Sequence, residues 1–67
     1  MDKLASWRKG QHLNFEEAGK LVGVTGVAWA RYERGRIPRP EIIRKIEAAT
    51  AGKVRPADFF RLTVSAA

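Results

Sequence analysis

Apolar residues recur at helical spacing in successive segments of the chain, and glycine, proline or a capping residue bounds each segment. In the second segment, Phe15, Ala18 and Val22 lie three or four positions apart, as they would on one face of a helix. Residues 62–67 carry no helical pattern, and both a strand and an irregular tail remain open for them. The pattern predicts an all-α fold of five short helices, which cover residues 2–9, 14–23, 25–35, 40–52 and 56–61 with their capping and stop residues included.

Capping residues define where these helices begin and end. Asn14 is a favoured N-cap, and Glu17 follows three residues later, which is the spacing of a capping box. Thr25 is a second good N-cap, and Pro40 suits the first position of the fourth helix. Gly23 interrupts the second segment as a left-handed C-cap residue does. The helices are therefore expected to be joined by tight turns.

The second and third helices meet across a turn of three or four residues, which is the helix-turn-helix arrangement. Helices that cross this closely need a small residue at their contact, and Gly19 provides one four residues before the turn. Gly23 adopts the positive φ that the turn requires without strain, and Val24 is the apolar residue that plugs it. The residues expected to anchor both helices in the core are Ala18, Val22, Trp29 and Tyr32.

The stretch from Leu13 to Pro38, LNFEEAGKLVGVTGVAWARYERGRIP, resembles the Cro/CI-type (XRE-like) repressors of phages and bacteria. Within it, the run RYERG followed by Ile37 and Pro38 is especially similar to that family, and PEIIRKIEAATAGKVRPADFF resembles its small YdaS-type branch. The resemblance implies a five-helix, lambda-repressor-like helix-turn-helix domain that binds operator DNA as a homodimer, usually to repress transcription.

The chain departs from this family pattern in two places. Phe15 stands where the family usually has glutamine, a side chain that typically contacts a phosphate. Gly26, Val27 and Ala28 stand where the family often has polar residues that read bases. Both departures concern the DNA contacts rather than the fold.

Size and charge narrow the possible functions. A chain of 67 residues is enough for one domain, residues 1–67, and leaves little core for an enzyme's substrate cleft. Thirteen Lys and Arg against seven Asp and Glu give a net charge of +6, which favours polyanions such as nucleic acid. There is no cysteine, and His12 has no second ligand at metal-binding spacing, so we expect neither a metal nor another cofactor. Without a signal-peptide pattern or a long apolar run, we expect a cytoplasmic, bacterial or phage-encoded protein associated with the nucleoid.

The third helix is expected to lie in the major groove of double-stranded DNA with its N-terminal part against the base edges. Arg31 is the side chain suited to reading guanine, and Val27 and Ala30 suit contacts with thymine methyl groups. Phosphate contacts are expected from Lys20, Arg34, Arg36 and Arg39, and are plausible from Arg8 and Lys9. The DNA-binding residues predicted in this way are Lys20, Thr25, Gly26, Val27, Ala30, Arg31, Arg34, Arg36 and Arg39.

Several aromatic and charged residues are expected to have structural roles rather than to contact DNA. Trp7, Trp29 and Tyr32 are expected in the core rather than stacked on bases, and Glu33 is expected to pair with a nearby arginine. The expected dimer surface comprises the fourth and fifth helices and the tail, including Phe59, Phe60 and Leu62, because two adjacent phenylalanines do not easily both fit so small a core.

The main alternative to a DNA-binding regulator is a protein-interaction module that binds RNA polymerase or another regulator. It is motivated by the low polar content of residues 26–28. Binding to an anionic membrane is disfavoured, because glycine and proline interrupt the chain and its basic residues are scattered.

Overall fold

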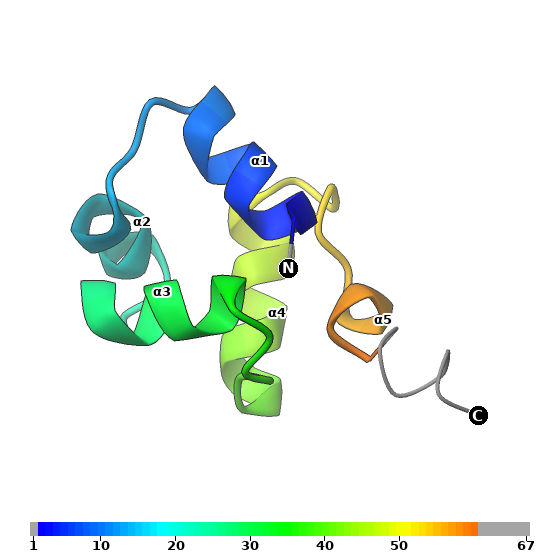
Figure 1. Ribbon diagram of the computed structural model, residues 1–67. Helices are drawn as coiled ribbons and strands as arrows, with labels where there is room; N and C mark the ends of the chain where they lie inside the picture. The colour runs from blue at the N-terminus through cyan, green and yellow to red at the C-terminus, as the bar shows by residue number, and fades with distance from the viewer. Residues whose placement is uncertain (1, 61–67) are drawn as a thin grey trace.

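The computed structural model describes residues 2–60 and folds them into five short helices with no strand among them (Figure 1). Their bounds are α1 Asp2–Gly10, α2 Phe15–Leu21, α3 Gly26–Glu33, α4 Pro40–Ala49 and α5 Pro56–Phe59. The predicted all-α, five-helix fold is thus confirmed. The expectations for residues 61–67, including Leu62 in the dimer surface, lie outside the described residues.

The two predicted N-caps of the helix-turn-helix segment are present. Asn14 and Glu17 form the complete capping box: the Glu17 N–H donates to Asn14 Oδ1 at 2.7 Å, and the Asn14 N–H donates to Glu17 Oε1 at 2.9 Å. Thr25 Oγ1 accepts from the Ala28 N–H at 3.1 Å. Both side chains therefore satisfy amide groups that have no carbonyl partner inside the helix.

The fourth helix ends earlier than its sequence pattern predicts, at Ala49 rather than near Gly52. The reason is the buried hydroxyl of Thr50, which donates to the Glu47 carbonyl at 3.2 Å and accepts from the Val54 N–H at 3.1 Å. Ala51 and Gly52 then turn the chain with φ angles of 54° and 81°. Thr50 thus ends α4 and ties the following turn to it.

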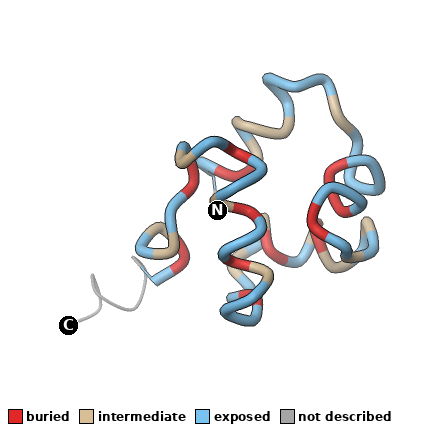
Figure 2. The backbone as a smooth tube through the Cα atoms, turned by 180° about the vertical axis from the view of Figure 1, so that it is seen from behind, coloured by how far each residue is buried: buried red, intermediate tan, exposed pale blue. Residues whose placement is uncertain are grey.

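All five helices contribute buried residues to the core, and so does Val54 in the loop before α5 (Figure 2). In Figure 1, α4 stands between α2 and α3 on one side and α5 on the other. The buried apolar residues are Leu4, Ala18, Val22, Trp29, Tyr32, Ile43, Ile46, Val54 and Phe59. The expected anchors of the helix-turn-helix segment are all among them.

The two tryptophans also belong to this core. Trp29 is fully buried, and half-buried Trp7 packs against it with ring centroids 6.2 Å apart. The core placement predicted for both rings is therefore confirmed. Within residues 2–60, no helix has the length and apolar character needed to cross a bilayer.

Candidate nucleic-acid interface

Two glycines let α2 and α3 touch through their backbones. A Cβ atom on Gly19 would lie 2.5 Å from the Val24 carbonyl oxygen and 2.9 Å from that of Thr25. A Cβ atom on Gly26 would lie 2.9 Å from the Glu16 nitrogen and 3.0 Å from its Cα atom. Because all these neighbours are main-chain atoms, no side-chain rotation can make room. The angle between the two helices is therefore set by backbone contact.

The turn between these helices has the predicted construction. It comprises residues 22–25, with Gly23 at a φ of +75° and half-buried Val24 packed against the core. The Val24 N–H donates to the Gly19 carbonyl at 2.9 Å, which ties the turn to the last part of α2. The predicted roles of Gly19, Gly23 and Val24 are confirmed.

Gly26 is oriented differently from the expectation. Helical spacing assigns it to the outward face of α3, but the direction of its missing side chain points at the backbone of α2. The reason is that α2 crosses the first turn of α3 on this side. A residue with a side chain therefore cannot replace Gly26 without a shift of the backbone.

The outward face of α3 carries the remaining predicted reading residues. Val27 is 65% exposed, while Trp29 and Tyr32 are buried on the opposite side of the helix. Ala30 and Arg31 each lie three or four positions from both Val27 and Arg34, which keeps the four residues on one face. The exposed or half-exposed residues of this face are Val27, Ala30, Arg31 and Arg34.

A groove of about 370 Å³ runs between α2 and the N-terminus of α3. It brings together four predicted residues, Lys20, Thr25, Gly26 and Val27, together with Glu16 and Val24. The Glu16 carboxylate lies in the first turn of α2, where a negative charge favours the start of the helix. Its position in this groove disfavours a phosphate at the same place, because like charges repel.

Arg36 and Arg39 lie in the connection from α3 to α4 and line a second hollow, which also touches Val24. Val24 therefore borders both hollows. The nine predicted residues thus divide into the outward face of α3, the α2–α3 groove and the connection before α4. The structure does not gather them into a single pocket.

The polar cluster behind α3 is centred on Glu33. Its Oε2 atom accepts from Arg8 Nε at 2.6 Å and from Trp29 Nε1 at 2.6 Å. A second guanidinium N–H of Arg8 donates to the Leu13 carbonyl at 3.0 Å, and the group stacks 4.4 Å from the centroid of the Phe15 ring. The predicted pairing of Glu33 with an arginine is confirmed.

This cluster assigns structural roles to Arg8 and Phe15 that the sequence did not reveal. The Arg8 side chain is only 12% exposed and is held by Glu33, so the structure disfavours the phosphate contact suggested for it. Phe15 covers the Arg8 guanidinium and presents no polar group to DNA. Arg8 and Phe15 lie seven positions apart on separate helices, so their spacing gives no sequence signal of this contact.

The cations of the candidate interface are free to meet an external anion. In the described part of the chain, no ion pair includes Lys20, Arg31, Arg34, Arg36 or Arg39. The same residues 2–60 contain no group of three or more His, Cys, Asp or Glu side chains placed to hold a metal ion. The candidate interface therefore presents cationic and apolar side chains to a partner.

Comparison with known proteins supports the same assignment of the fold. Residues 2–64 match a family model described as a helix-turn-helix domain. No curated protein and no solved structure matches the chain. The match spans almost the whole sequence and includes α2, the turn and α3.

Proposed function

The chain belongs to this helix-turn-helix domain family, and we propose that it is a sequence-specific regulator of transcription that binds double-stranded DNA through α3. The observation that carries the proposal is the outward face of α3, where Arg31 and Arg34 are exposed and form no ion pair with any residue from 2 to 60, beside a turn held by backbone contact. A reading helix needs this combination of an accessible face and a fixed position.

In the proposed complex, the N-terminal half of α3 enters the major groove. Arg31 donates to O6 and N7 of a guanine, while Val27 and Ala30 contact thymine methyl groups. Phosphate contacts come from Lys20, Arg34, Arg36 and Arg39, and they position the domain without reading sequence.

We further propose the Cro/CI type of action for the chain, with a homodimer that represses transcription from an inverted-repeat operator. Two-fold symmetry would place the half-sites about 34 Å apart. Phe59 is buried whereas Phe60 is 43% exposed, so the end of α5 leaves one large apolar side chain for a partner subunit. This exposed ring supports the dimer surface expected at this end of the chain.

The experiment that tests DNA binding is selection of bound fragments from a random double-stranded library at about 0.15 M salt. Enrichment of an inverted repeat is the expected result and would support the dimeric regulator. Binding without enrichment would overturn sequence-specific reading and leave a non-specific binder. If no DNA is retained, the proposed function is wrong.

Arg31→Ala tests the reading residue on the selected site. We expect a loss of roughly 1–3 kcal/mol in binding free energy and a relaxed preference at one base pair. Arg44→Ala is the matched control, because Arg44 is an exposed arginine of α4 outside the candidate interface. Equal losses in the two variants would show that Arg31 acts only through its charge.

A second candidate function is a protein-interaction module that binds RNA polymerase or another regulator. The observation that favours it is the apolar content of the α2–α3 groove, where Val27 is 65% exposed beside Val24. This function predicts weak DNA binding without sequence preference even at low salt, so the library selection distinguishes the two candidates.

A further inference from the structure

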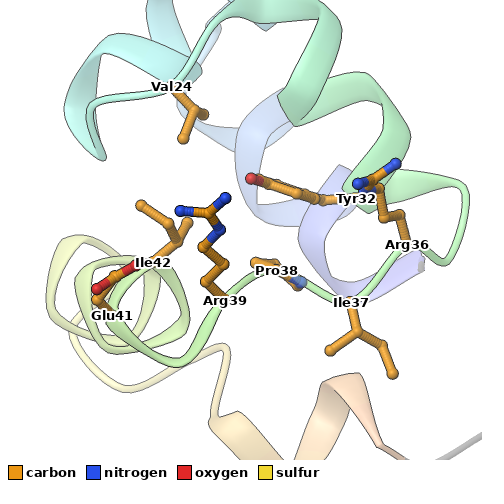
Figure 3. A pocket seen from close by; sticks show the side chains of 8 residues that line it. All are labelled: Val24, Tyr32, Arg36, Ile37, Pro38, Arg39, Glu41 and Ile42. Atoms are coloured by element: carbon orange, nitrogen blue, oxygen red, sulfur yellow. The ribbon is translucent and has the colours of Figure 1, made fainter.

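A hollow of about 280 Å³ lies between the helix-turn-helix turn, the end of α3 and the beginning of α4 (Figure 3). Val24 and Ile42 contribute apolar wall, and Pro38 lies between the two arginines of the connection. The volume is slightly below the usual range for small-molecule sites, roughly 300–1,000 Å³, which restricts the ligand to a small one. The hollow therefore has the size and the mixed lining of a site for a small ligand.

Tyr32 contributes a polar atom to this hollow that has no protein partner. The residue is only 8% exposed, and its hydroxyl makes no hydrogen bond to any residue from 2 to 60. Figure 3 shows the hydroxyl oxygen directed into the hollow, toward the guanidinium group of Arg39. No buried side-chain polar atom of the described residues lacks a hydrogen-bond partner, so the unbonded Tyr32 hydroxyl is open to solvent although its ring is buried. It is therefore free to donate a hydrogen bond to a bound ligand.

Two arginines complete the polar lining. Arg39 precedes α4 without capping it through its side chain, and Arg36 lies beside the Tyr32 ring (Figure 3). Neither forms an ion pair within the described range, not even with Glu41, the acidic residue of the lining. Two guanidinium groups against one carboxylate leave the hollow positively charged, and the N-terminal end of the α4 dipole adds to this.

We propose that this hollow binds a small organic oxyanion, in which a carboxylate or phosphate group is carried on a short apolar body. Arg36 and Arg39 pair with the anionic oxygens, and the Tyr32 hydroxyl donates a hydrogen bond to one of them. The apolar body lies against Val24 and Ile42. The ligand is a single small molecule, because the hollow has no room for a folded segment.

Such a ligand regulates DNA binding if Arg36 and Arg39 are also phosphate contacts, and this consequence rests on the proposed function. The ligand and the DNA backbone then compete for the same two guanidinium groups. By linkage, each weakens the binding of the other by the same factor. The small molecule would therefore release the domain from its operator.

The site is tested with the full chain by following backbone amide NMR signals during titration with benzoate and, separately, with phenyl phosphate at constant ionic strength. We expect saturable shifts centred on the hollow, and the probe that binds more tightly identifies the anionic group. Tyr32→Phe removes the hydroxyl but keeps the buried ring, and should weaken binding about tenfold. Arg39→Gln should abolish it.

Arg44→Gln makes the same change of charge outside the hollow and should leave the dissociation constant within about twofold. The proposal is overturned if the shifts do not saturate, if Tyr32→Phe binds as tightly as the wild type, or if Arg44→Gln weakens binding as much as Arg39→Gln. The folded signal pattern of Tyr32→Phe without ligand establishes that any loss arises in the site.

The regulatory consequence has its own readout, the affinity for the selected operator with and without the better probe at fixed ionic strength. The probe should weaken operator binding by the wild type and have about tenfold less effect on Tyr32→Phe, which keeps both arginines. Unchanged operator affinity at saturating probe would overturn the competition. If the wild type binds no DNA, the proposed function fails, and the NMR titration still decides whether the hollow is a site.

Discussion

Replacing Gly19 by alanine tests whether backbone contact between α2 and the turn holds the helix-turn-helix segment together. The new Cβ atom would lie 2.5 Å from the Val24 carbonyl oxygen, well inside the usual contact distance. The turn cannot move away freely, because the Val24 N–H is bonded to the Gly19 carbonyl at 2.9 Å. Overpacking of this kind costs about 3 kcal/mol at the upper end of its usual range. Alanine's better helix propensity offsets about 1 kcal/mol of it.

We therefore expect Gly19→Ala to lower the free energy of unfolding by about 2 kcal/mol, which corresponds to roughly 10 °C in Tm for a domain of this size. The assay is thermal and urea denaturation followed by circular dichroism. The control is Gly10→Ala, because Gly10 is also helical, has no atom within 4 Å of its Cβ direction and is not at positive φ. This variant should be unchanged or up to about 1 kcal/mol more stable. Equal Tm values for the two variants would refute the claim that the crossing excludes a side chain at Gly19.

Three further predictions concern residues that hold the fold around the interface. Glu33→Gln should destabilise the domain by about 3 kcal/mol, because it leaves the largely buried Arg8 guanidinium without its carboxylate. A double-mutant cycle with Arg8→Met measures the coupling energy between the two side chains, and additive losses would contradict the pairing. Thr50→Val should cost about 1–3 kcal/mol, because the buried Val54 N–H loses its acceptor, whereas Thr50→Ser, which keeps the hydroxyl, should unfold at nearly the wild-type urea concentration. Ala51→Gly should stabilise the domain by about 0.5–1 kcal/mol, because relief of left-handed strain at a φ of 54° outweighs the added chain entropy; a lower Tm for this variant would show that the strain is absent.

The parts of the fold that follow from short-range rules were predictable from the sequence. Asn14 with Glu17 and Thr25 define two helix starts, because a side chain reaches an amide only two or three residues away. The glycines at 19 and 23 could be assigned in the same way, since the turn that requires them lies within five residues. In these cases the partner atoms are close in the chain, so spacing alone identifies them.

Contacts between distant segments were not predictable in this way. Arg8 reaches Glu33 across 25 positions, and the sequence offers several other arginines as partners for that carboxylate. Gly26 has the spacing of an outward residue, and only the crossing of α2 shows that its Cβ direction is occupied. The early end of α4 depends on one hydroxyl bond, from the Val54 N–H to Thr50, which competes with continuation of the helix.

These contacts also limit how the interface can recognise DNA. With Gly26 turned toward α2 and Phe15 stacked on Arg8, the first turns of α3 and α2 each present one polar side chain fewer than a typical reader of this kind. In the proposed complex, direct reading then depends on Arg31, while Val27 and Ala30 add apolar contacts. Specificity at the other base pairs has to come from the shape and deformability of the DNA. The phosphate contacts would then supply most of the affinity, so operator binding by this domain should fall steeply with added salt.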